Sequence, residues 1–209
     1  MKPFQVLFFL GIILLFQNCS PIIKLLYGIH QPKVLTKEKI TRFLTKNNLD
    51  TTNNVAITEK NYLYVINKIE MTFPEIMVFD RNGNLIPYKK NNECNASAFK
   101  FIDSLSPLKN YSLIDSVNLS LFEKTLCDLN GKIQAKIIDP KANYYLLIFW
   151  TEWTGKLNKN HTYVWEQKAK NNKNVFIKTI KVNCDFQSFW SEVEREKNIK
   201  ALLAPEKKK

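Results

Sequence analysis

Seven apolar residues follow one another without interruption at positions 144–150, with the sequence YYLLIFW. A strand that exposes one face to water alternates apolar and polar residues, whereas a strand covered on both faces is apolar throughout. A run of this length is also short for a helix. We therefore expect a central strand at 144–150, in a sheet with helices packed on both faces.

A helix and a second strand are expected after this run. Residues 156–171 carry their larger side chains at helical spacing, and residues 175–182, VFIKTIKV, are rich in β-branched residues. The predicted inward stripe of the helix consists of Leu157, His161, Val164, Trp165 and Lys168. Because a strand–helix–strand unit crosses over with a right hand and makes its strands parallel, the sequence predicts an α/β fold. A last helix is expected over 187–197, with an inward face of Phe189, Trp190 and Val193.

The first part of the chain has shorter patterns. Thr36 is a good N-cap for a helix over 36–46, residues 49–56 are expected to form a loop, and a second helix is expected after Thr58.

Two Asn-Gly turns predict hairpins. Residues 80–83, DRNG, separate two short apolar runs, and residues 128–131, DLNG, stand between two further short strands. Asn-Gly between apolar runs is a strong hairpin signal because both residues accept the positive φ that tight turns need. A helix capped by Asn95 is expected after the first hairpin.

The N-terminus has the pattern of an export signal. Lys2 precedes an uninterrupted apolar run over 6–16, which is too short to span a bilayer, and Cys19 follows it closely. This arrangement resembles a bacterial lipoprotein signal, in which the cysteine is lipidated and becomes the mature N-terminus. The alternative is a signal anchor lengthened by the apolar residues 21–29, which Lys24 interrupts. Both interpretations place the rest of the chain outside the cytoplasm.

The charge of the chain argues against a nucleic-acid function. The formal net charge is +12, but the basic residues are scattered lysines, and only Arg42, Arg81 and Arg195 are arginines. Proteins that read nucleic acid rely on arginine for bidentate contacts. We therefore expect no nucleic-acid partner and assign the lysines to solvated surfaces.

Metal, phosphate and hydrolytic sites are not predicted. His30 and His161 are the only histidines and no cysteine pair has C-x-x-C spacing, so no zinc pattern exists. His30 is expected to be solvated, and His161 is expected to pack inside the fold. No cofactor is expected.

Three groups of residues resemble the extracytoplasmic thioredoxin-like proteins of the TlpA and redoxin kind. In that family a D-x-x-G-K turn precedes a buried strand that ends in F-W-A-x-W-C-G-P-C, and the next strand ends in V-N-x-D. The matching residues are Asp128, Gly131 and Lys132, then Phe149, Trp150, Trp153 and Gly155, then Val182, Asn183 and Asp185. The resemblance covers residues 120–199. It implies a thioredoxin-like fold, a mixed sheet with flanking helices, here with an N-terminal α/β extension.

The residues that would carry dithiol chemistry are absent. Thr154 and Leu157 stand where the resemblance places the two cysteines, and Lys156 replaces the proline between them. A thiol–disulfide oxidoreductase needs one thiolate to attack and a second thiol to resolve the mixed disulfide. We therefore expect a vestigial active-site loop, formed by Trp153, Thr154, Gly155, Lys156 and Leu157.

The remaining cysteines leave alternatives open. Cys184 follows the second strand of the resemblance and could face the vestigial loop as a lone redox cysteine, or be a small buried side chain. Cys94 and Cys127 could form a disulfide, or be two buried thiols.

The order of the elements is also open. A thioredoxin fold needs a further hairpin and helix after the second strand, and the chain after residue 200 is too short for them. Residues 72–105 have the pattern of that missing part, and Pro74 stands where the family has its cis-proline. Residues 72–105 therefore complete the sheet in a permuted order, form an independent subdomain, or are replaced at the sheet edge by a second copy.

These observations combine into one functional hypothesis. The predicted segments are a signal peptide (1–18), the lipidated Cys19 with a tether (19–34), an N-terminal αβ unit (35–115), a thioredoxin-like unit (116–200) and a basic tail (201–209). We expect a lipid-anchored binding or scaffolding module of a bacterial cell envelope, without dithiol catalysis, that meets an envelope protein through Trp153, Thr154 and Lys156. The alternative is a thiol–disulfide oxidoreductase or redox chaperone that uses Cys184. A structural envelope protein without a site is the third possibility.

Overall fold

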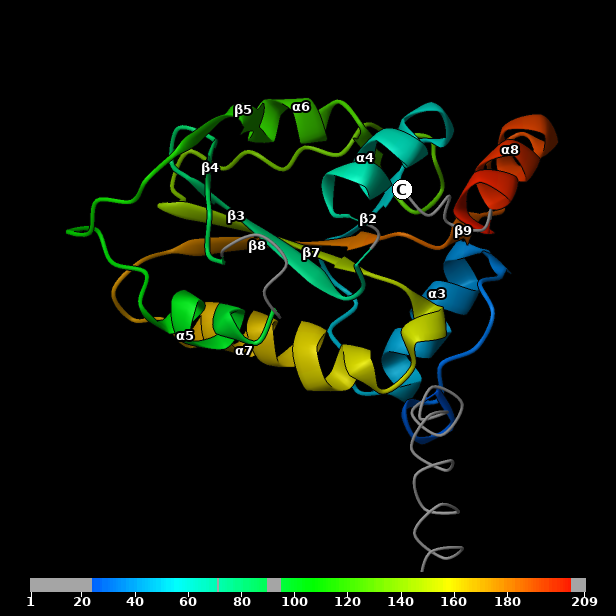
Figure 1. Cartoon of the computed structure of the whole chain (residues 1–209), viewed down its shortest axis with the longest axis horizontal. Coiled ribbons are helices and arrows are strands. Elements are labelled where there is room, and N and C mark those ends of the chain that lie inside the picture. The colour runs from blue at the N-terminus through cyan, green and yellow to red at the C-terminus, as the bar shows by residue number, and fades with distance from the viewer. Residues whose placement is uncertain (1–23, 71, 90–94, 204–209) are drawn as a thin grey trace, which may run out of the picture.

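The structure, a computed structural model, describes residues 24–70, 72–89 and 95–203 (Figure 1). It has a mixed α/β fold built on a seven-stranded sheet with strand order β5-β4-β3-β7-β8-β2-β6. Strands β2 (Asn54–Ile57), β7 (Tyr144–Trp150) and β8 (Ile177–Asn183) are mutually parallel. The antiparallel strands are β3 (Glu75–Asp80), β4 (Asn84–Ile86), β5 (Ile114–Asn118) and β6 (Leu126–Cys127). A two-residue strand β1 (Val34–Leu35) pairs separately with β9 (Phe186–Gln187).

Helices cover both faces of the sheet (Figure 1). Their bounds are α3 (Lys37–Lys46), α4 (Tyr62–Lys68), α5 (Ser97–Asp103), α6 (Leu119–Glu123), α7 (Val164–Asn171) and α8 (Glu192–Leu203). Short helical turns are η1 (Glu59–Asn61), η2 (Glu152–Thr154) and the π-helical turn η3 (Lys159–Tyr163). Helices α4 and α6 pack on one face, and α5 and α7 on the other.

The position of β7 between two cores accounts for its uninterrupted apolar sequence. Alternate residues enter opposite cores: Leu147 and Phe149 pack with α4 and α6, whereas Leu146 and Ile148 pack with α5 and α7. All seven residues of β7 are buried, as expected from the apolar run. Trp150, the last of them, joins a third cluster under α3.

Several local predictions are confirmed. Helix α3 begins after Thr36, whose hydroxyl accepts from the Lys39 amide at 3.4 Å. The predicted turn joins β3 to β4, with Gly83 at φ +83° and the Asp80 carboxylate accepting the Asn82 and Asn84 amides.

Residues 72–105 contribute β3 and β4 to the main sheet and α5 to one of its faces. Strand β3 pairs with β7 along its whole length, from Glu75 opposite Phe149 to Asp80 opposite Tyr144. The hairpin therefore lies beside the central strand although it precedes that strand by about sixty positions of the chain. Of the three alternatives that the sequence leaves open for residues 72–105, the structure has the one in which they are part of the main sheet.

Two predicted element bounds are wrong. Residues 54–56, expected as part of a loop, belong to β2, because β8 and β6 on either side supply hydrogen-bond partners for so short a strand. The last helix begins at Glu192 rather than at residue 187, and Val193 is 77% exposed. The aromatic residue Trp190 is buried from an irregular segment, with its indole N–H donating to the Ile57 carbonyl at 3.1 Å.

The inward stripe of residues 156–171 is also displaced from its predicted position. The buried side chains are Asn158, Thr162, Trp165, Glu166 and Ala169. Two of these are polar groups with buried partners: Asn158 donates to the Thr151 carbonyl, and Glu166 accepts from Lys181. The predicted stripe is chosen mainly by apolar character, and such a choice places Asn158 and Glu166 on the exposed side of the helix.

Candidate functional site

The loop that the sequence analysis predicts to be a vestigial active site, residues 153–157, follows β7 at the carboxyl edge of the parallel strands; we keep the name vestigial loop for it. Thr151 leaves the strand, η2 makes one tight turn, and Gly155 adopts φ +57°. The turn packs against the end of β8 and against the residues before β3. There the Phe73–Pro74 peptide bond is cis, at the position where the sequence analysis expects a cis-proline, and the Phe73 ring meets Trp153 edge to face at 5.6 Å.

Thr154 and Leu157, which the resemblance places at two cysteine positions, differ in their surroundings. Thr154 is buried, and its hydroxyl donates to the Thr151 carbonyl at 2.8 Å. The side-chain amide of Asn158 donates to the same carbonyl, also at 2.8 Å. Leu157 is half-buried and Lys156 is exposed. The loop is thus held by its own hydrogen bonds and presents neither thiol nor activated hydroxyl.

The segment before β1 lies directly on this loop, and the side chain of His30, expected to be solvated, is 34% exposed. The Tyr27 carbonyl accepts the Lys156 amide at 2.7 Å, and the His30 amide donates to the Trp153 carbonyl at 3.0 Å. The His30 ring is 3.1 Å from the Glu152 carboxylate. A Cβ on Gly155 would lie 2.3 Å from the Tyr27 oxygen, so glycine is required here for packing as well as for its φ. The backbone of the predicted binding face around Thr154 and Lys156 is therefore covered by the chain itself.

Cys184 lies next to the loop but points inward. Its amide donates to the Trp150 carbonyl at 2.8 Å, whereas its thiol contacts the Val182 carbonyl at 3.4 Å and the residue is 1% exposed. Burial, together with the nearby Asp185 carboxylate, raises the pKa of the Cys184 thiol well above its ordinary value. Since thiolates rather than thiols attack disulfides, this position is unsuited to redox chemistry.

Cys127 is a second buried thiol. Its sulfur is 3.6 Å from the Ala56 carbonyl, and burial, reinforced by Asp128, raises its pKa to about 12. The thiol is free. Cys94, the other half of the predicted disulfide, and Cys19, the predicted lipidation site, lie outside the described residues.

Asp185 is the unusual titratable group of the site. It is fully buried beneath η2, and one carboxylate oxygen accepts the Glu152 amide at 2.7 Å and the Asn183 side-chain amide at 2.8 Å. The other oxygen has no hydrogen-bond partner among the residues that the structure describes. Burial raises the pKa of Asp185 to about 7. The V-N-x-D spacing marks this residue in the sequence, but nothing local indicates that its carboxylate is buried.

His161 packs as expected. Its ring lies between Phe99, at 5.6 Å, and Trp165, at 5.3 Å, and one ring nitrogen is 3.2 Å from the Leu157 carbonyl. Over the described residues, no group of three or more metal-ligating side chains comes together. Within the same part of the chain, every helix is too short or too polar to cross a bilayer.

An apolar groove of about 620 Å³ opens beside the vestigial loop. Its walls come from four separate parts of the chain, namely the covering segment, the turn before β3, η2 and the end of α8. The apolar lining consists of Ile29, Pro32, Phe73, Trp153, Leu202 and Leu203. Sequence reasoning placed Trp153 at this surface but missed the other walls, which are far apart in the sequence.

Comparison of the chain with family models, curated proteins and solved structures returns no match.

Proposed function

We propose that this chain is a thioredoxin-like binding module of the cell envelope that has no dithiol chemistry and holds a protein partner in the groove at Trp153. The observation that carries the proposal is the combination found at the end of β7. An apolar groove opens there, while the two positions that the resemblance gives to cysteines hold Thr154, which is buried, and Leu157, which is half-buried.

The sheet order supports the thioredoxin-like part of the proposal. Strands β2, β8 and β7 are parallel, and β3 and β4 continue the sheet in antiparallel fashion. The resemblance implies a mixed sheet with flanking helices, and in this proposal the hairpin and α5 take their places before the central strand instead of after β8. The chain would then be a permuted version of that fold.

The chemistry of the groove favours a protein partner. Aromatic side chains dominate the energy of protein interfaces because they bury a large area at a small cost in conformational entropy. Trp153 and Phe73 are only partly buried and already stand edge to face, so they offer a preformed wall. Apolar side chains of an envelope protein are the ligands that fit, and the predicted lipid on Cys19 would keep the module at the membrane.

Site-specific crosslinking tests this proposal. A photoreactive phenylalanine analogue at position 153 is expected to give a discrete adduct with one envelope protein in living cells. The same analogue at Phe176, which is 46% exposed and lies at the other end of β8, is the matched control and should give none.

A second change in the groove makes the result specific. Leu202→Glu puts a charge into the apolar wall and is expected to lower the yield of the position-153 adduct at least tenfold, because burying an unpaired carboxylate is costly. Thermal unfolding of the variant verifies that the fold is retained. An adduct that is equally abundant at position 176, or is unaffected by Leu202→Glu, would refute the proposed groove.

A further inference from the structure

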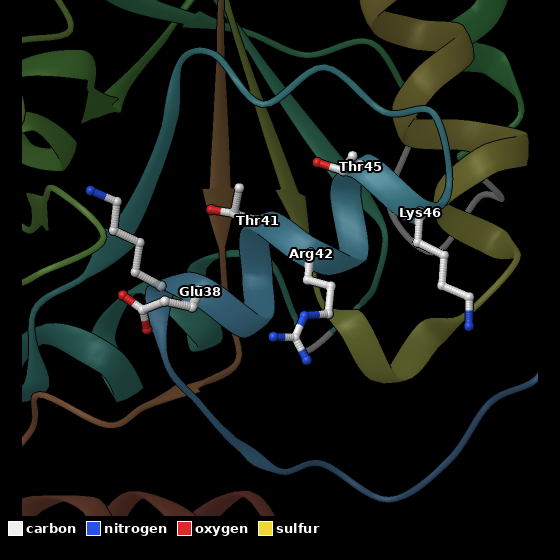
Figure 2. A pocket seen from close by; sticks show the side chains of 6 residues that line it. Glu38, Thr41, Arg42, Thr45 and Lys46 are labelled. Carbon is white, nitrogen blue, oxygen red and sulfur yellow. The ribbon is translucent and has the colours of Figure 1, made fainter.

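Four basic side chains cluster beside the segment that covers the vestigial loop. We call Lys33, Lys39, Arg42 and Lys46 the basic face; all four are exposed, and three of them belong to α3. They line a hollow of about 560 Å³ between α3 and residues 28–35. Figure 2 shows α3 from a neighbouring hollow, where Arg42 and Lys46 extend from the same side of the helix.

Within the described residues no ion pair reaches the basic face, although the acidic Glu38 lines the neighbouring hollow with Arg42 and Lys46. None of the ion pairs in that part of the chain involves any of its four side chains. Glu152 is the only acidic residue that lines the hollow, and it already pairs with His30. Arg42 is also the one arginine whose guanidinium makes no hydrogen bond in the described structure, since Arg81 and Arg195 each donate to a backbone carbonyl.

The basic face lies close to the predicted membrane anchor. Gly28 lines the same hollow and belongs to a single helical turn with Lys24, in which the Ile29 amide donates to the Lys24 carbonyl at 2.8 Å. Lys24 stands five positions after Cys19. Five extended residues reach at most about 17 Å, so a lipid on Cys19 holds this part of the molecule at the bilayer surface.

Two exposed apolar residues belong to the same helical turn. Leu25 is 83% exposed and Leu26 is 62% exposed. Apolar side chains next to lysine and arginine are the pattern of segments that lie in the interface of anionic membranes.

We propose that the basic face, with Leu25 and Leu26, docks on an anionic phospholipid bilayer and fixes the orientation of the domain on the membrane. This inference rests on the proposed envelope location. The phosphate groups of the lipids would be the negatively charged partners of the four basic side chains. The hollow of the basic face and the groove at Trp153 share only His30 among their lining residues.

Vesicle sedimentation tests the docking surface without the lipid anchor. The chain from residue 20 is suitable because all three core clusters consist of residues after position 33. It is expected to bind vesicles made of equal parts phosphatidylcholine and phosphatidylglycerol, and not vesicles of phosphatidylcholine alone. Lys39→Gln, Arg42→Gln and Lys46→Gln should each weaken binding roughly fivefold, the contribution typical of one cation at a membrane surface.

Matched variants separate this surface from the general positive charge of the chain. Lys141→Gln and Lys173→Gln remove exposed lysines before β7 and β8, at the opposite edge of the sheet, and should leave binding unchanged. Equal binding to neutral vesicles, equal losses in these controls, or displacement by inorganic phosphate at constant ionic strength would overturn the inference. Because the basic-face variants leave Trp153 untouched, crosslinking at position 153 tests the groove independently.

Discussion

Replacing Glu166 by alanine is expected to lower the free energy of unfolding by about 3–5 kcal/mol. Glu166 on α7 is 2% exposed and accepts from the ammonium group of Lys181 on β8 at 2.8 Å. Lys181 is 1% exposed, and its remaining partners are the Asp50 carbonyl at 2.8 Å and the Asp50 carboxylate at 3.9 Å. Without Glu166, the Lys181 ammonium group would stay buried after losing its closest negative charge. Burial already lowers the pKa of Lys181, although Glu166 opposes that effect.

A surface pair provides the matched control for Glu166→Ala. Asp103→Ala breaks an ion pair with Lys168 in which the aspartate side chain is 54% exposed, and it should cost less than about 1 kcal/mol. The double variant Glu166→Leu with Lys181→Met should recover most of the loss, because apolar residues of similar volume need no charge partner. Chemical denaturation of all three measures the differences. A loss below 1 kcal/mol for Glu166→Ala would show that the pair is hydrated in solution.

The stability of the fold is expected to fall as pH rises from about 4 to 7, and Asp185→Asn should remove most of that fall. The pKa of Asp185 is raised from 3.8 to about 7, chiefly by burial. Between these values the folded chain keeps a proton that the unfolded chain has released, so raising the pH favours unfolding. Each unit of pKa corresponds to about 1.4 kcal/mol, so this group alone accounts for roughly 4 kcal/mol across the interval.

Comparison of the wild type with Asp185→Asn at several pH values isolates this effect. Asparagine keeps an oxygen for the Glu152 and Asn183 donors but cannot ionise. The variant should match the wild type near pH 4 and exceed it in stability at pH 8. Asp50 and Asp128 have lowered pKa values and therefore act in the opposite direction, below pH 4. Parallel pH profiles for the two proteins would contradict the assigned protonation of Asp185.

The sequence predicts elements whose cause is local. The apolar run of β7, the Thr36 cap and the turn at Gly83 each depend on neighbouring residues, and all three are present in the structure. The turn after β7 could be located for the same reason, since residues 151–155 follow the strand at once.

Features that depend on distant partners could not be read in this way. Glu166 is buried only because Lys181 lies opposite it on another element. The docking of Tyr27 on Lys156 joins residues more than a hundred positions apart, and the groove at Trp153 needs walls from both ends of the chain. Their causes are tertiary, and no periodicity in the sequence records them.

Thiol trapping on the folded protein tests the central claim, that the site beside β7 performs no thiol chemistry. The chain from residue 20 is treated with a maleimide at neutral pH and analysed by peptide mass spectrometry, with a denatured sample as the reference for full labelling. We expect Cys184 and Cys127 to stay unlabelled until the protein unfolds, because both thiols are buried and protonated. Rapid labelling of Cys184 in the folded chain, or its recovery in a mixed disulfide with glutathione, would contradict the account and make the chain a single-cysteine redox protein.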